Sequence, residues 1–102
     1  MRYKVLVSEA ALEDLEEIKL SIVRNYNDVY SAQKVEKKIK LSINSLTIMP
    51  ARSRITANLY KVHAGKYKII YEINSNIVLV LAIIHTKRDF SVRNIKARKW
   101  QI

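Results

Sequence analysis

The chain has 102 residues, 49% of them hydrophobic, and carries 19 Lys and Arg against 9 Asp and Glu, for a net charge of +10. This composition excludes a disordered polyelectrolyte and fits one small domain with its own core. The absence of cysteine excludes disulfides, thiolate catalysis and zinc–thiolate sites. The longest apolar run, residues 77–84, is too short to cross a membrane, so we expect a soluble, cytoplasmic protein.

The positive charge is concentrated in the second half of the chain. Residues 1–50 hold 8 Lys and Arg against 7 Asp and Glu, whereas residues 51–102 hold 11 against 2. A basic field on one part of a small domain favours a polyanionic partner, such as nucleic acid or an acidic protein. The alternative is a lysine-rich surface that is merely solvated.

The first half predicts a strand followed by two helices. Residues 3–7 alternate and are rich in β-branched side chains, which indicates a strand. Ser8 suits the N-cap of a helix, and residues 25–28 (NYND) break that helix and cap the next one. Pro50 is expected to end the second helix. So short a connection predicts an antiparallel helical hairpin.

The second half changes to strand periodicity. Residues 59–63 and 66–73 alternate, and residues 77–84 are continuously apolar, as in a central strand. Ala64-Gly65 and residues 74–76 are the expected turns, and residues 91–100 form either a short basic helix or a loose tail. We therefore predict a single α+β domain over residues 1–102, with a small antiparallel sheet and two helices packed on one face.

Strand alternation predicts a basic cluster on the face of the sheet away from the helices. If Ala64-Gly65 is a two-residue turn, His63 lies opposite Lys66 and Lys61 lies opposite Lys68. Facing like charges are destabilising by up to about 1 kcal/mol per pair, which favours a role in binding an anion. The other face is expected to receive the helices, and its residues are Tyr60, Val62, Tyr67, Ile69 and Tyr71.

The position of His85 depends on the length of the preceding loop. A loop of even length places His85 and Lys87 on the face that carries Lys68. A three-residue loop, Asn74 to Asn76, reverses the register and turns His85 toward the helices. Both arrangements are compatible with the sequence.

The available side chains indicate phosphate chemistry without a metal or cofactor. The sequence has no glycine-rich phosphate loop, no nucleophile elbow and no spacing typical of a metal site. Metal-free RNA cleavage needs a base, an acid and cations at the phosphate, and we expect Lys68, His85 and Arg88 to supply them. The expected nucleic-acid contacts are Lys61, His63, Lys66, Lys87, Arg52 and Arg54.

Four segments in order resemble the RelE/ParE superfamily of bacterial type II toxin–antitoxin toxins over about residues 3–90. They are YKVLVSEAALEDLEEI, INSLTIMPARSR, GKYKIIYEI and VLAIIHTKRDF. The resemblance implies a small toxin held inactive by a co-encoded antitoxin that is acidic in its toxin-binding part. RelE-like members cut mRNA in the ribosomal A site, whereas ParE-like members inhibit DNA gyrase and cut no RNA.

The resemblance also bears on single residues. Lys68 stands where ribonucleolytic members often carry an arginine, and Arg88 falls near a second such arginine. Phe90 lies where some nucleases of the family use a tyrosine, and it has no hydroxyl group. The HTKRD segment, residues 85–89, is also similar to ParE-like members.

We therefore predict a ribosome-dependent mRNA endoribonuclease that inhibits translation, with the ribosome, mRNA and an antitoxin as partners. The alternatives are a gyrase inhibitor on the same scaffold and an inactive relative that binds nucleic acid. The antitoxin is expected to contact the helical pair and the basic tail, residues 93–99, around Trp100.

Overall fold

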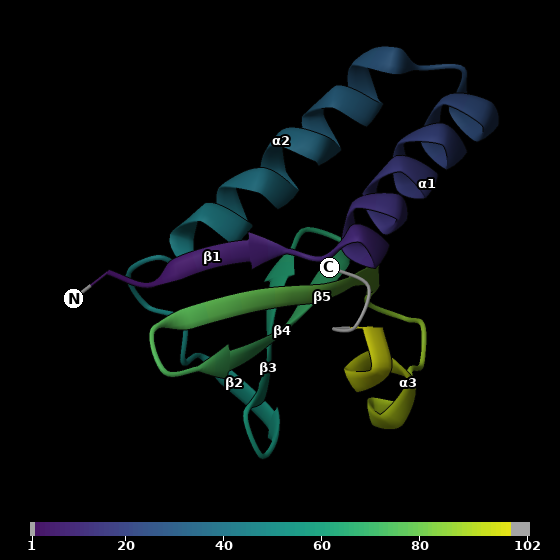
Figure 1. The fold of residues 1–102 in the computed structure, drawn as a ribbon. Helices are drawn as coiled ribbons and strands as arrows, with labels where there is room; N and C mark the ends of the chain where they lie inside the picture. Colours follow the sequence, from purple (N-terminus) through teal and green to yellow (C-terminus); the bar gives the residue numbers. More distant parts are fainter. Residues whose placement is uncertain (1, 99–102) are drawn as a thin grey trace.

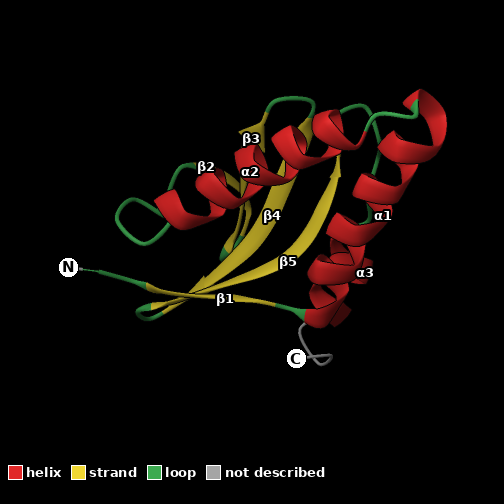
Figure 2. Ribbon diagram, turned by 90° about the horizontal axis from the view of Figure 1, so that it is seen from above, coloured by secondary structure: helices red, strands yellow, loops and turns green. Residues whose placement is uncertain are grey.

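The computed structural model describes residues 2–98, which form a five-stranded sheet between a helical hairpin and a short third helix (Figure 1). The elements are β1 (Lys4–Val7), α1 (Glu9–Tyr26), α2 (Val29–Ser45), β2 (Ser53–Thr56), β3 (Leu59–Ala64), β4 (Tyr67–Asn74), β5 (Ile77–His85) and α3 (Val92–Ala97). Seen from above, α2 lies over β3 and β4 while α1 lies beside β5 (Figure 2). No helix in this part of the chain is long and apolar enough to cross a bilayer.

The predicted α+β fold is confirmed, with two refinements in the sheet. The strand order is β1-β5-β4-β3-β2, and β1 pairs with β5 in parallel whereas the other pairs are antiparallel. The sheet is therefore mixed. The helical hairpin carries the chain from β1 at one edge of the sheet to β2 at the other edge. β2 was not predicted, since four mostly exposed residues give too short an alternating pattern.

The hairpin has the predicted caps. The Ser8 side chain accepts a hydrogen bond from the backbone N–H of Ala11, and Asp28 accepts one from the N–H of Ser31. Asn27 ends α1 in the left-handed conformation at φ 50°. α2 ends at Ser45, several residues before Pro50, and turns complete the connection.

Both faces of the sheet bury apolar side chains. On the hairpin side the buried cluster includes Ala11, Leu15, Ile39, Leu46, Ile69, Tyr71, Val78, Val80 and Ile83, and Tyr60, Val62 and Tyr67 pack against it. The prediction that this face of the sheet receives the helices is thus confirmed. A smaller cluster on the opposite face contains Leu59, Ile70, Leu79, Leu81, Ala82 and Ile95, which places α3 against that face. The short helix is present, and Lys99 and Trp100 lie outside the described residues.

A bulge in β5 reverses which side chains face the hairpin. The turn after β4 has even length, since Asn74 pairs with Ile77. The register then shifts, because Tyr71 pairs with Val80 and Ile70 pairs with Ala82, which leaves Leu81 as an extra residue. Residues 77–80 have the orientation predicted for a loop of even length, whereas residues 82–85, which follow the bulge, have the opposite orientation.

The turn between β3 and β4 lies one residue later than predicted. Ala64 pairs with Tyr67, so Gly65 and Lys66 form the turn, with Gly65 at φ 62°. The left-handed conformation favours glycine, and this is the only glycine in the chain. The predicted opposition of Lys61 and Lys68 is therefore wrong, although the residues keep their faces because the shift is even overall.

Candidate functional site

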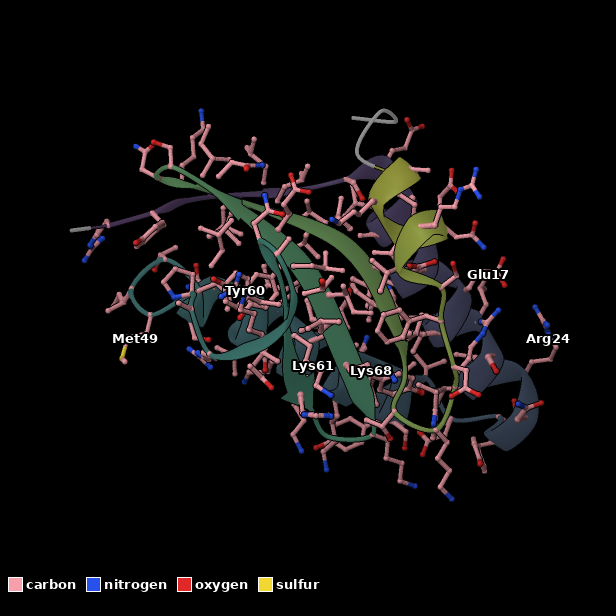
Figure 3. All side chains as sticks on the ribbon, turned by 90° about the horizontal axis from the view of Figure 1, so that it is seen from below. Glu17, Arg24, Met49, Tyr60, Lys61 and Lys68 are labelled. Atoms are coloured by element: carbon pink, nitrogen blue, oxygen red, sulfur yellow. The ribbon has the colours of Figure 1, made fainter. Side chains whose placement is uncertain are left out.

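Three side chains of β3 and β4 form the basic face, which we define as Lys61, His63 and Lys68. His63 lies directly opposite Lys68, and Lys61 lies opposite Ile70 on the same side of the sheet. Figure 3 shows Lys61 and Lys68 as neighbours on the face turned away from the hairpin. His63 is exposed and both lysines are partly buried. Three residues of the predicted cluster therefore share this face, with His63 rather than Lys61 opposite Lys68, whereas Lys66 lies in the turn and not opposite His63.

The ammonium group of Lys68 is held by the segment that follows β5. Its Nζ lies 4.9 Å from the centroid of the Phe90 ring and 3.4 Å from the carbonyl oxygen of Thr86. A ring face and a carbonyl oxygen are both contacts that a cation makes. Lys68 is thus positioned as a fixed positive charge at the edge of the open face.

Arg88 borders the same side of the sheet as Lys68. Ile84 pairs with Lys68 across the strands, and it lines a small cavity of about 290 Å³ together with Arg88 and Phe90. The Arg88 side chain is exposed, and its backbone N–H donates to the carbonyl oxygen of His85. Lys68 and Arg88 are therefore close enough in the fold to belong to one extended surface.

His85 lies on the other face of the sheet. It follows the bulge and pairs with Tyr67, whose ring it meets edge to face at a centroid distance of 5.6 Å. Its Nδ1 accepts the backbone N–H of Lys87 at 3.1 Å, which leaves Nε2 as the donor of the neutral ring. Of the two arrangements compatible with the sequence, the structure has the one in which His85 turns toward the helices. Its cause is the bulge at Leu81 and not a three-residue loop.

The remaining predicted contacts are dispersed. Arg52 donates to the Ser45 and Met49 carbonyl oxygens at the end of α2, and Arg54 donates to Ala57 in the turn before β3. Arg54 pairs with Tyr60, which places its side chain on the hairpin side. Lys66 is exposed in the β3–β4 turn and Lys87 is exposed after β5. The two arginines therefore have local structural contacts away from the basic face.

A clamp between α1 and α3 was missed in the sequence. The Arg98 guanidinium donates to both carboxylate oxygens of Asp14, at 2.7 and 2.9 Å, and to the carbonyl oxygen of Leu81 at 3.0 Å. Asp14 also accepts the N–H of Ile83, so both residues satisfy backbone groups freed by the bulge. The Asp14 carboxylate raises the pKa of Arg98. Helix periodicity gives no signal for a contact between residues 84 positions apart.

An apolar groove lies on the hairpin side, away from the basic face. It has a volume of about 630 Å³ and is lined by both helices and by the edge strand β1. Leu12 and Leu41 line it and are 51% and 61% exposed. Val5 and Val7 form its floor on β1. Exposed apolar side chains beside an open strand edge are typical of a surface that binds a protein partner.

The described residues offer no metal site. No group of three or more His, Cys, Asp or Glu side chains between residues 2 and 98 has a suitable arrangement.

Comparison with known proteins identifies the family. Residues 5–90 match the family described as the ParE toxin of the type II toxin–antitoxin system parDE. The chain belongs to this family, which confirms its assignment to the RelE/ParE superfamily, and it is a type II toxin by family. No curated protein matches the sequence significantly.

Solved structures show the same fold at low sequence identity. The chromosomal ParDE system from P. aeruginosa has a chain that is 13% identical with a TM-score of 0.75, and the match covers 84% of this chain and 98% of that one. A doubly substituted mutant of the E. coli toxin RelE in the free state is 14% identical with a TM-score of 0.61, covering 96% and 94%. The RelE–RelB complex from Pyrococcus horikoshii OT3 contains a chain that is 16% identical with a TM-score of 0.60, covering 87% and 100%.

Proposed function

We propose that this toxin acts in the manner of the ParE branch, by binding and inhibiting DNA gyrase without cutting RNA. The observation that carries the proposal is the separation of His85 from Lys68 and Arg88 by the sheet. General acid–base cleavage requires its acid and base within hydrogen-bond reach of one phosphate. The placement of His85 and Lys68 on opposite faces of the sheet argues against their joint action on one phosphate, and the family match to ParE supports the same proposal.

The basic face then serves as a binding surface. Lys61, Lys68 and Arg88 supply fixed positive charge, and Phe90 adds an aromatic surface next to Lys68. Charges in this arrangement steer and orient an anionic partner without any bond being broken. The expected partner surface is acidic or carries phosphates, and a gyrase–DNA complex offers both.

A RelE-like endoribonuclease is the second candidate. The exposed imidazole of His63 lies opposite the Lys68 amine, so the basic face itself contains one titratable group beside a cation. In this alternative His63 replaces His85 as the acid or base, and Lys68 and Arg88 bind the phosphate. Phe90 cannot supply the hydroxyl that some nucleases of the superfamily use.

Three assays separate these candidates, two on an induced culture and one on the purified toxin. For gyrase inhibition we expect intact mRNA by primer extension, together with gyrase-dependent DNA breaks and inhibition of supercoiling by the purified toxin. Discrete cleavages within codons, abolished by His63→Asn and retained by His85→Asn, would establish the nuclease instead. Harmless expression at a high level would contradict both.

We further propose that a cognate antitoxin, acidic in its toxin-binding part, occupies the apolar groove beside β1. An apolar segment of the antitoxin would cover Leu12 and Leu41, and its acidic side chains would meet Lys37 and Lys40 on the groove wall. Leu41→Lys should abolish neutralisation by the antitoxin and leave growth inhibition intact. Leu20→Lys is the matched control, because Leu20 is 52% exposed on α1 and does not line the groove.

A further inference from the structure

A second cavity of about 640 Å³ lies between the tip of the helical hairpin and the β3–β4 turn. Its volume is in the range of small-molecule sites, which are about 300–1,000 Å³. Its lining includes side chains that can donate hydrogen bonds, among them Lys38, Lys66 and His85. The proposed gyrase inhibition uses none of these three residues.

The Lys38 side chain lies against Gly65, and both residues line this cavity. A Cβ atom built on Gly65 would lie 3.4 Å from both Nζ and Cδ of Lys38. This spacing is an ordinary van der Waals contact, and the positive φ of Gly65 is what favours glycine here. The turn therefore lets the Lys38 amine approach the backbone, next to Lys66, which follows in the same turn.

His85 presents a defined donor to the same cavity. Its Nδ1 is occupied by the Lys87 N–H, so the nitrogen available to a ligand is Nε2, which carries the proton in the neutral ring. The edge-to-face contact with Tyr67 fixes the orientation of the ring. This histidine is thus arranged to donate a hydrogen bond on the hairpin side of the sheet.

The charge of the lining favours an anion. Lys38 and Lys66 are two cations, and Asp28 is the acidic residue of the lining. The Asp28 carboxylate accepts hydrogen bonds from the N–H and the hydroxyl of Ser31, at 3.1 and 2.6 Å, in its role as the N-cap of α2. Its oxygens are engaged in the helix cap, which leaves the lysines available to a ligand.

Aromatic side chains form the rest of the recognition surface. Tyr67 and Tyr26 line the cavity, and Tyr26 is 75% exposed at the end of α1. Aromatic faces at a partly open cavity suit a planar heterocycle, on which they can stack as they do on the bases of nucleic acids. A ligand that combines an anionic group with a planar ring would therefore use both parts of this lining.

We propose that this cavity binds a nucleoside phosphate, with the phosphate between Lys38, Lys66 and His85 Nε2 and the base against Tyr26 and Tyr67. The proposal is independent of gyrase inhibition, because the cavity and the basic face lie on opposite sides of the sheet. A bound nucleotide would bridge α1, α2 and the β3–β4 turn.

The test is titration of the purified full-length toxin with AMP, adenosine and inorganic phosphate by calorimetry at one fixed ionic strength. AMP should bind more tightly than either fragment. Lys38→Gln and Lys66→Gln should each weaken AMP binding by about tenfold, as expected for the loss of one charge-assisted hydrogen bond. Both positions are exposed, so the variants should fold.

Two controls distinguish the cavity from general electrostatics. Lys37→Gln removes a neighbouring charge of α2 that lines the apolar groove, and the Lys61→Gln/Lys68→Gln double variant removes charge from the basic face. Both should retain AMP affinity within about twofold, as for surface changes away from a site. Equal weakening by the controls, equal affinity for phosphate and AMP, or no measurable AMP binding would each overturn the proposal, whatever the outcome of the gyrase assays.

Discussion

The two faces of the sheet differ in how completely they are covered, although the same strands supply both. On β4, Ile69 and Tyr71 point to the hairpin side and are fully buried, whereas Lys68 points to the other side and is partly exposed. Helices of 18 and 17 residues cover the first face, but a helix of 6 residues covers part of the second. The shorter cover leaves the basic face open.

This difference assigns stability mainly to one face and binding mainly to the other. Apolar burial is worth about 25 cal/mol per Å², so the face with two long amphipathic helices supplies most of the folding free energy. The opposite face keeps a smaller core under α3 and retains space for cations. Substitutions on the two faces should therefore have separable effects.

The largest expected effect comes from the hairpin side. Ile39 is fully buried in α2, and Ile39→Ala should lower the free energy of unfolding by about 2–5 kcal/mol through lost burial and a cavity. Ile95→Ala in α3 should cost less, near the lower end of that range, because its helix is short and its cluster is smaller. Urea denaturation of both variants measures the difference.

A larger decrease in the free energy of unfolding for Ile95→Ala than for Ile39→Ala would show that the smaller cluster contributes more to stability. In that case α3 would be an integral part of the core rather than a cover over part of the second face.

The second prediction concerns the clamp that joins the two sides. Asp14→Asn keeps the shape of the side chain and should cost about 1.5–3 kcal/mol, as for hydrogen bonds to charged groups. Arg98→Gln should cost a similar amount, and the double variant should cost much less than the sum, because each single change already removes the ion pair that joins the two residues. Additive losses would show that the two residues act independently.

The bulge explains why the sequence predicted the two faces only in part. The alternation in residues 59–73 correctly separated Lys61 and Lys68 from Tyr67, Ile69 and Tyr71, because a strand alternates regardless of its exact register. In β5 every residue from 77 to 84 is apolar, so no polar position marks the register shift at Leu81. The face of His85 depends on that unmarked residue.

Long-range contacts account for the other differences. The backbone groups of Leu81 and Ile83 at the bulge are hydrogen-bonded by the side chains of Ser8, Asp14 and Arg98. These three residues come from opposite ends of the chain and share no sequence pattern. The parallel pairing of β1 similarly depends on where the hairpin returns the chain. Helix caps were predicted correctly because Ser8 and Asp28 act on backbone groups only three residues away.

The third prediction tests the open face. Lys61→Gln with Lys68→Gln should sharply reduce growth inhibition, and the unfolding free energy should fall by no more than about 1 kcal/mol, because only the partly exposed cation contacts of Lys68 with Phe90 and Thr86 are lost. Colony counts after induction and urea denaturation provide the two readouts. Arg54→Gln is the matched control, since Arg54 is a cation of β2 on the hairpin side. Toxicity equal to that of the unchanged chain would remove the basic face from the mechanism.

The smallest effect is expected from an ion pair that links the two helices above the covered face. Glu36 of α2 accepts a hydrogen bond from Lys19 of α1 at 2.9 Å and lies 3.3 Å from Lys40. The hydrogen bond from Lys19 lowers the pKa of Glu36 below its ordinary value of 4.5. The carboxylate therefore stabilises the fold fully above pH 4.5, and this contribution is lost as the pH falls through the lower pKa of the folded state.

Glu36→Gln should reduce the loss of stability on acidification below pH 4.5 and leave toxicity unchanged. Thermal unfolding at a series of pH values measures the slope, and Glu17→Gln is the control because Glu17 is an exposed carboxylate of the same hairpin. An unaltered slope in Glu36→Gln would mean that Lys19 and Lys40 do not hold the carboxylate in solution. The two helices would then be held together without a contribution from this ion pair, by the apolar side chains that they bury against the sheet.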